Sequence, residues 1–172
     1  MRAAAREIAG KIAAEIATPN IAKGSCTTML ANESVSVPRS GTATQPIVFR
    51  GSGPGAVLDG ADAAIAAGVN WTPAAGGTWS RPTGFATGHV VSEAGRLYRY
   101  GSMAALQALA AGAPGGFFFD GTTLYLKFAD ASAPVGHAVH VARLEDGFVV
   151  DGRSFVRVEN LEIRHYGAGD YG

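Results

Sequence analysis

Several side chains capable of acid–base chemistry gather near the C-terminal end of the sequence. Arg164, His165 and Tyr166 are consecutive, and Asp170 and Tyr171 follow within a few residues. A polysaccharide lyase neutralises a uronate carboxylate with a cation and removes the neighbouring proton with a base such as His or Tyr. These residue types suit that task. Charged and aromatic side chains also alternate on the outward face of any exposed strand, so a purely structural role stays open.

Two glutamates are the nearest pair that could serve a glycosidase, which needs two carboxylates about 5–10 Å apart across a groove. Glu159 and Glu162 flank a turn at Asn160, so we expect them to lie on different sheets. Asp59 and Asp151 each precede a glycine. Asp-Gly pairs are typical of turns, and we expect both aspartates to be structural.

Two tryptophans are further candidates for binding sugars. Trp71 and Trp79 flank a glycine-rich bend, and aromatic faces suit the C–H faces of pyranose rings. The alternative is that they fill a small core. The candidate polysaccharide-binding residues are therefore Arg164, His165, Asp170, Trp71 and Trp79, and no catalytic residue is assigned.

The histidines do not form a metal-binding motif. His89, His137, His140 and His165 are scattered, and His137-x-x-His140 is expected on a passage from a loop into a strand. This arrangement does not match a recognised zinc-binding signature. Nucleophile-elbow, phosphate-loop and dinucleotide motifs are also missing from the sequence. We expect neither metal nor cofactor in this chain.

Composition narrows the function further. The chain has 172 residues, with 14 Lys and Arg balanced by 14 Asp and Glu, which argues against nucleic acid or an anionic membrane as partner. No apolar run reaches the roughly 18 residues of a membrane span. The 24 Gly and 8 Pro favour a β protein dense in turns. Cys26 is the single cysteine, so an internal disulfide is ruled out.

Two segments, 33–60 and 146–172, share one pattern of short alternating strands separated by Gly, Pro, Asn or Asp. Alternation with period two places apolar side chains on one face of each strand. We expect the later segment to stack in parallel on the earlier one. The later inward pairs, Val156 with Val158 and Leu161 with Ile163, should be buried against Ile47, Phe49 and Val57.

These segments resemble a known family. SGTATQPIVFRGSGPGAVLDG and FVVDGRSFVRVENLEIRHYG are similar to successive turns of the right-handed parallel β-helix in the pectin-lyase-like superfamily. The resemblance implies an all-β fold and a carbohydrate-active protein, either a polysaccharide lyase or a glycoside hydrolase, located outside the cell or in the periplasm. The superfamily also hosts inert adhesins, so a non-catalytic carbohydrate-binding or adhesion module is the alternative.

The segment between the two coils has its own pattern. A helical turn is expected at 61–67, a hairpin at 88–92 and 96–100, and a helix from the Ser102 cap to about Ala111. A second hairpin is expected at 117–119 and 124–128 around Asp120-Gly121. GGFFFDGTTLYLKFADASAPVGHAVHVA is similar to an insert between early coils of many bacterial β-helix proteins. That resemblance implies a β-rich subdomain that walls a substrate groove.

The expected domain organisation follows. A capping helix over residues 3–17, with Ile8, Ile12 and Ile16 on one face, lies within an N-terminal segment 1–32. The first coil is 33–60, the insert 61–145 and the second coil 146–172. Charged residues interrupt the N-terminal apolar stretch, so it does not resemble a signal peptide.

Two coils are fewer than the roughly three repeats that such a fold needs. We therefore expect this chain to be the N-terminal part of a longer protein and to be inactive alone. The open coil end should drive self-association. The resemblance allows calcium in the complete protein.

Overall fold

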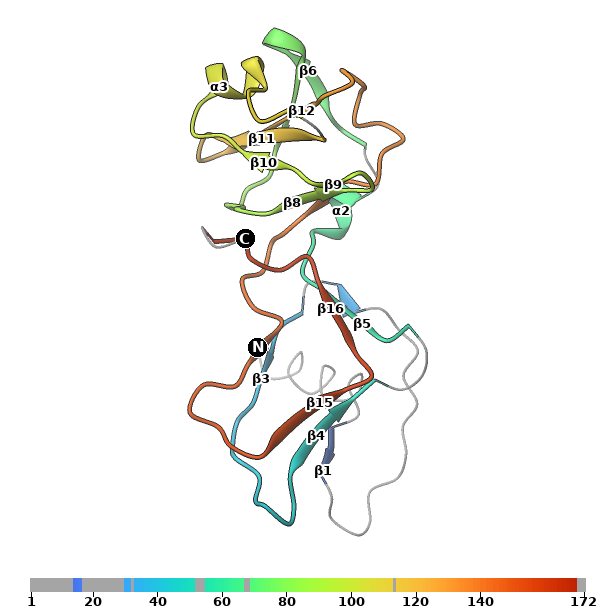
Figure 1. Cartoon of the computed structure of the whole chain (residues 1–172), viewed down its shortest axis with the longest axis vertical. Helices are drawn as coiled ribbons and strands as arrows, with labels where there is room; N and C mark the ends of the chain where they lie inside the picture. The colour runs from blue at the N-terminus through green and yellow to red at the C-terminus, as the bar shows by residue number, and fades with distance from the viewer. Residues whose placement is uncertain are drawn as a thin grey trace. The chain divides into compact units, whose positions relative to one another are not determined.

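The computed structural model describes the backbone of residues 14–16 and 30–31, and residues 33–51, 55–66, 69–112 and 114–169 in full (Figure 1). The described chain is mostly β, with short helices and small mixed sheets. Contacts divide it into two compact units. Unit 1 comprises Met1–Asp59 and Asp146–Arg164, and unit 2 comprises Gly60–Glu145 and His165–Gly172.

Unit 1 joins an early and a late set of strands. Three early strands each pair in parallel with a late one, in the same order along the chain: β3 with β14, β4 with β15 and β5 with β16. The parallel pairing expected from the sequence is confirmed. The early strands are β1 (Ala14–Ile16), β2 (Leu30–Ala31), β3 (Val35–Ser36), β4 (Ile47–Arg50) and β5 (Val57–Asp59). The late strands are β14 (Phe148–Val149), β15 (Val156–Glu159) and β16 (Glu162–Arg164).

The register agrees with expectation in β15 and differs by one residue in β16. Val158 lies opposite Phe49, but Ile163 lies opposite Leu58 rather than Val57. The expected burial is wrong for Val158 and Ile163, which are 42% and 45% exposed, whereas Val156 packs against the core. Each of β14, β15 and β16 ends its sheet among the described strands. An inward side chain on such a strand is covered from one side only.

The small core of unit 1 lies under the early strands. It contains Val37, Ile47 and Phe49, with Val35, Phe148 and Val156 packed against them. The rings of Phe49 and Phe148 meet edge to face at 5.3 Å. Aromatic pairs favour this geometry, and burial of these side chains stabilises the stack of β3 and β4 under β14 and β15.

The N-terminal helix expected over 3–17 is contradicted where the structure describes it. Residues 14–16 form β1, which pairs antiparallel with β4. The edge of β4 opposite β15 carries backbone groups that need partners, and such pairing overrides local helix propensity. The rest of the expected helix lies outside the described residues.

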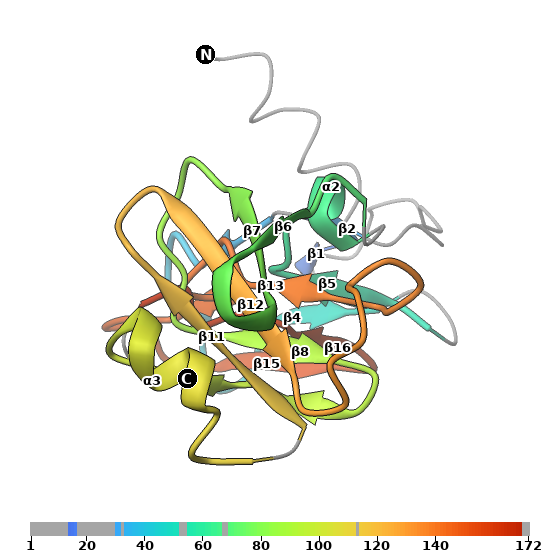
Figure 2. The same cartoon turned by 90° about the horizontal axis from the view of Figure 1, so that it is seen from above.

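The described part of unit 2 contains two sheets and two short α-helices. The five-stranded sheet has the order β10-β11-β12-β7-β6, and the three-stranded sheet the order β13-β8-β9. Figure 2 labels β6, β7, β11 and β12 of the first sheet and β8 and β13 of the second. The first sheet contains β6 (Thr72–Ala74), β7 (Thr78–Pro82), β10 (Tyr98–Arg99), β11 (Gly115–Phe119) and β12 (Thr123–Phe128). The second contains β8 (Val90–Ser92), β9 (Gly95–Arg96) and β13 (His140–Val141). The helices are α2 (Ala63–Ala66) and α3 (Met103–Ala108), and a 3-10 turn, η1, spans Ala75–Gly77.

The predicted turns, helices and hairpins of this unit form, with some different bounds. Helices α2 and α3 are shorter than predicted, β11 and β12 are longer, and Tyr98–Arg99 pairs with β11 instead of β8. The Ser102 hydroxyl caps α3 by accepting from the Ala105 N–H at 3.2 Å. The helix ends before Ala111 because Leu109 adopts a left-handed conformation, with φ of 50°. Both hairpins form, β8 with β9 and β11 with β12. Asp120 closes the second by accepting from the backbone N–H groups of Thr122 and Thr123.

The core of unit 2 lies between its sheets. Alternate residues of β12 point into it, as the sequence pattern predicts. The fully or nearly fully buried members are Ile65, Trp71, Val90, Leu97, Phe117, Leu124, Leu126, Phe128, Val139 and Val141. This core is larger than that of unit 1 and holds the loops that carry the polar side chains described next.

Candidate functional site: two cavities in unit 2

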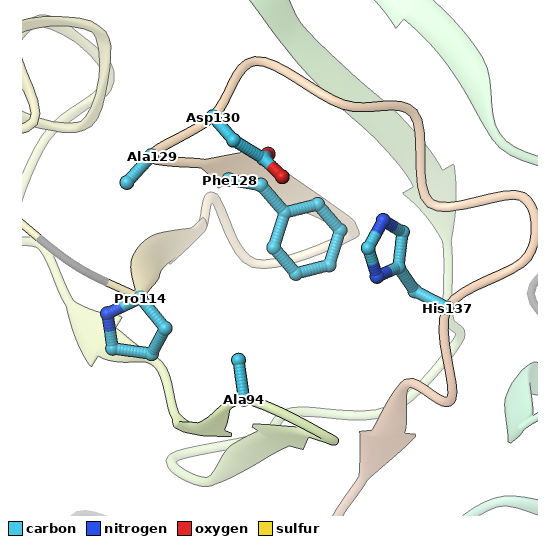
Figure 3. A pocket seen from close by; sticks show the side chains of 6 residues that line it. All are labelled: Ala94, Pro114, Phe128, Ala129, Asp130 and His137. Atoms are coloured by element: carbon cyan, nitrogen blue, oxygen red, sulfur yellow. The ribbon is translucent and has the colours of Figure 1, made fainter.

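Two open cavities of similar size lie in unit 2, and Pro114 lines both. The first, about 460 Å³, is lined by Ala94, Pro114, Phe128, Ala129, Asp130 and His137 (Figure 3). The second, about 480 Å³, is lined by Arg96, Leu97, Tyr98, Arg99, Ala111, Pro114 and Gly115. We name them the His137 cavity and the Tyr98 cavity.

The His137 cavity has an apolar wall and a polar end. The rings of Phe128 and His137 lie beside each other, with centroids 4.5 Å apart and planes tilted by 31° (Figure 3). Phe128 ends β12, and His137 lies in the loop that leads into β13. Packing against Phe128, which belongs to the core, restricts the orientation of the imidazole.

A chain of hydrogen bonds runs through His137. Its Nδ1 contacts Oε1 of Glu93, and its Nε2 lies 3.0 Å from the Ser132 hydroxyl. The other Glu93 oxygen accepts from the Ala138 N–H at 3.0 Å. Asp130 Oδ1 accepts from the Ser132 hydroxyl at 2.6 Å and from the Ser132 N–H at 2.9 Å. Each polar atom of the imidazole therefore has a partner.

The two carboxylates that take part in these hydrogen bonds, those of Glu93 and Asp130, are stabilised in their ionised form. Hydrogen bonds from its own backbone N–H and from the His137 ring lower the pKa of Glu93. Hydrogen bonds from the hydroxyl and then the backbone N–H of Ser132 lower the pKa of Asp130. A hydrogen bond to the charged form of an acid favours that form. Both groups are accordingly acceptors at neutral pH.

The Tyr98 cavity is aromatic and cationic. Tyr98 is 57% exposed, and its ring meets that of Tyr100 edge to face at 4.9 Å. The Tyr100 hydroxyl accepts from the Ala111 N–H at 2.8 Å, which fixes its ring. A glycine is required at position 116, because a Cβ there would lie 2.3 Å from the Tyr100 ring and would displace it. Arg96 and Arg99 line the same cavity.

Arg164, which the sequence proposes for binding a uronate, takes part in ion pairs of unit 1. Its Nε donates to Asp59 at 2.9 Å, and its Nη1 to Glu162 at 3.2 Å. The hydrogen bond to Asp59 is the main reason that the pKa of Arg164 is raised. Asp59 lies in β5 directly opposite Arg164, not in a turn. Arg50 and Glu159 form a similar cross-strand pair at 2.7 Å.

The remaining predicted residues belong to unit 2 or lie outside the described residues. His165 belongs to unit 2, where its ring stacks on that of His140 at 4.1 Å. Trp71 is 7% exposed and lies in the core, which leaves its ring without an open face for a sugar. Trp79 is half-buried against the same core, and its sugar-binding role stays a prediction. Asp170 lies outside the described residues.

Sequence reasoning missed the residues that line or support the two cavities. Glu93 lies in the turn between β8 and β9, and His137 lies 44 residues later. Antiparallel pairing of β8 with β13 brings the two loops together. The Asp-x-Ser spacing of Asp130 and Ser132 is a local turn signal, but it does not indicate which histidine lies beside the hydroxyl.

Neither helix in the described part of the chain is long and apolar enough to cross a membrane. Comparison of the chain with protein-family models, with curated proteins and with solved structures finds no match.

Proposed function

We propose that the chain is part of a carbohydrate-active protein built on a right-handed parallel β-helix, and that it binds an acidic polysaccharide. The fold part of the proposal is supported by unit 1. Three consecutive early strands pair in parallel with three consecutive late strands in the same order. Coils of a β-helix stack in this way, because each strand pairs with its counterpart one turn later.

The observation that carries the binding proposal is the Tyr98 cavity. Two arginines and an exposed tyrosine line a space of about 480 Å³. A guanidinium pairs with a carboxylate through two parallel hydrogen bonds. A tyrosine face covers the C–H face of a sugar ring at little entropic cost. This combination suits a uronate residue better than a neutral sugar.

The complete protein is a polysaccharide lyase or glycoside hydrolase under this proposal, and the chain alone binds without cleaving. The alternative is a non-catalytic binding or adhesion module. The ion pairs of unit 1 favour this non-catalytic alternative. Glu159 is paired with Arg50, and Glu162 and Arg164 are paired with each other. The groups first considered for glycan cleavage are thus engaged within the fold.

Calorimetric titration with polygalacturonate and alginate, with neutral dextran as comparison, tests the binding proposal. Arg96→Gln and Arg99→Gln should each weaken binding to the acidic polymers several-fold, and raised salt should weaken it further. Tyr98→Ala should weaken binding too. Arg157→Gln, which removes an exposed arginine of β15 in unit 1, is the matched control. Equal affinity for dextran, or equal loss with the control, contradicts the proposal.

Self-association belongs to the same proposal. Among the described strands, β14, β15 and β16 are all at sheet ends, and Val158 and Ile163 are exposed on two of them. Open strand edges with apolar side chains pair readily with another chain. Light scattering after size exclusion should show a mass that rises with concentration. Val158→Lys combined with Ile163→Lys should keep the chain monomeric, and a wild-type monomer at all concentrations refutes the idea.

An extracellular or periplasmic location follows from the same proposal. Calcium is assigned to the complete protein rather than to this chain. Repeating the titrations with and without added calcium checks that assignment. A calcium-dependent affinity for polygalacturonate in the present chain would overturn it.

A further inference from the structure

The side chains of Ser132, His137 and Glu93 are aligned as a hydroxyl, an imidazole and a carboxylate. The Ser132 hydroxyl lies 3.0 Å from Nε2 of His137, and Nδ1 of the same ring contacts Glu93. This order of groups turns a serine into a nucleophile in unrelated hydrolase folds. Such sites are recognised by geometry rather than by position in the sequence.

The carboxylate sets the tautomer of the imidazole. An ionised glutamate only accepts hydrogen bonds, so Nδ1 of His137 carries the proton that faces Glu93. Nε2 is then left as the acceptor that faces Ser132, which is the form needed of a general base. The Ala138 N–H, 3.0 Å from the second Glu93 oxygen, holds the carboxylate in place.

The loop that carries Ser132 is held in a tight turn. Ala131, just before it, has a φ of 61°, in the left-handed region that non-glycine residues rarely adopt. Asp130 accepts hydrogen bonds from both the backbone N–H and the hydroxyl of Ser132. The hydroxyl proton therefore has two acceptors, Asp130 and His137. Rotation about the Cβ–Oγ bond is enough to move it from the first to the second.

The cavity beside these groups can hold a small acyl chain. His137 and Asp130 form its polar part, and Phe128, Ala94 and Pro114 its apolar wall (Figure 3). We propose that Ser132, His137 and Glu93 form a hydrolytic site for small acyl esters. Ser132 is the nucleophile, His137 the general base and acid, and Glu93 a positioning residue that orients the ring. The site does not depend on carbohydrate binding at the Tyr98 cavity.

The reaction balances without a further reactant. Oγ of Ser132 forms a bond to the carbonyl carbon of the ester, and its proton moves to Nε2 of His137. The bond from that carbon to the alcohol oxygen breaks, and the alcohol leaves with the proton from His137. Water then attacks the acyl-serine while His137 takes and returns one proton. The products are a carboxylic acid and an alcohol, and Ser132 is restored.

A fluorophosphonate probe tests the site without knowledge of the natural substrate. The full chain is incubated with the probe, and the labelled residue is identified by peptide mass spectrometry. We expect one adduct, on Ser132, and turnover of p-nitrophenyl acetate above that of buffer. Ser132→Ala and His137→Gln should abolish both. Ser80→Ala, which removes a hydroxyl that donates to the Thr72 carbonyl, should change neither.

Glu93 requires a readout that a structural role alone would not affect. Glu93→Gln should slow labelling at least about tenfold, since the carboxylate orients the ring and stabilises the imidazolium. Glu93→Asp should recover part of the rate. Tryptophan fluorescence identifies any variant that fails to fold. If a variant does not fold, the residue labelled in the wild-type chain still shows whether Ser132 is the nucleophile. An unlabelled wild-type chain, or an adduct on another residue, overturns the proposal.

Discussion

The cross-strand ion pairs of unit 1 allow a test of whether Arg164 serves the fold. Arg164 and Arg50 occupy equivalent positions, each directly opposite an acidic residue on a parallel strand. Their surroundings differ. The side chain of Asp59 is 8% exposed and that of Arg164 33%, whereas those of Arg50 and Glu159 are 49% and 31% exposed. The same substitution, Arg to Gln, should therefore lower the local stability of unit 1 by different amounts at the two positions.

The expected magnitudes follow from burial. A hydrogen bond between charged groups that is largely shielded from water contributes about 1.5–3 kcal/mol. An exposed ion pair contributes about 0.2–1 kcal/mol, because water and salt screen it. Arg164→Gln should therefore speed opening of β5 and β16 roughly 10- to 150-fold. Arg50→Gln should speed opening of β4 and β15 less than about sixfold.

Hydrogen–deuterium exchange by mass spectrometry measures this opening strand by strand. Peptides that cover β5 and β16 report on the Arg164 pair, and those that cover β4 and β15 report on the Arg50 pair. Hydrogen exchange is the better measurement here, because both tryptophans lie in unit 2 and their fluorescence would report on that unit rather than on unit 1. Equal effects of the two substitutions, or no effect of Arg164→Gln, would refute the reasoning that burial sets the difference.

Three further predictions concern the core, the pH dependence and the activity. Leu126→Ala, at a fully buried position of β12, should lower the free energy of unfolding of unit 2 by about 2–5 kcal/mol. Chemical denaturation followed by the fluorescence of Trp71 and Trp79 measures this loss. A loss below about 1 kcal/mol would contradict the assigned packing. The pKa of Glu93 is lowered from its ordinary value of 4.5, so its contribution to stability is present above that pH and is lost as the pH falls through the folded-state value. The melting temperature of the wild type should therefore drop more between pH 6 and pH 3 than that of Glu93→Gln, and parallel curves would count against the lowered pKa. The chain should not cleave pectate, alginate or xylan, because Arg164, Glu159 and Glu162 are engaged in ion pairs. Assays of reducing ends and of ultraviolet-absorbing products, with and without calcium, measure cleavage. Turnover that disappears in Arg164→Ala or His165→Ala would contradict this prediction.

Local patterns in the sequence were enough for much of the secondary structure. The alternation in Thr123–Phe128 predicted which face of β12 is buried, and Asp120-Gly121 predicted the preceding turn. Ser102 predicted the start of α3. These features depend on residues a few positions apart, whose preferences for turns, caps and alternating faces act within the segment itself.

The parallel pairing of the early and late segments was predicted correctly. Burial, and the pairing of residues 14–16, were harder to predict, since both depend on what lies beside a strand. Alternation placed Val158 and Ile163 on the inward face, but both are exposed because their strands end the sheets. Residues 14–16 have a helical pattern, yet they pair with β4. Backbone hydrogen bonds offered by a neighbouring strand outweigh a weak local propensity.

The candidate sites were decided by tertiary structure alone. Asp59 and Arg164 lie 105 residues apart, and Glu93 and His137 lie 44 apart. The first pair meets because β5 and β16, which carry the two residues, pair in parallel. The second pair meets because β8 and β13, which lie next to the loops that carry the two residues, pair with each other. A single sequence shows which residues could do chemistry. Their convergence depends on the register of strands that are distant in the chain, and that register is determined by packing of the whole unit.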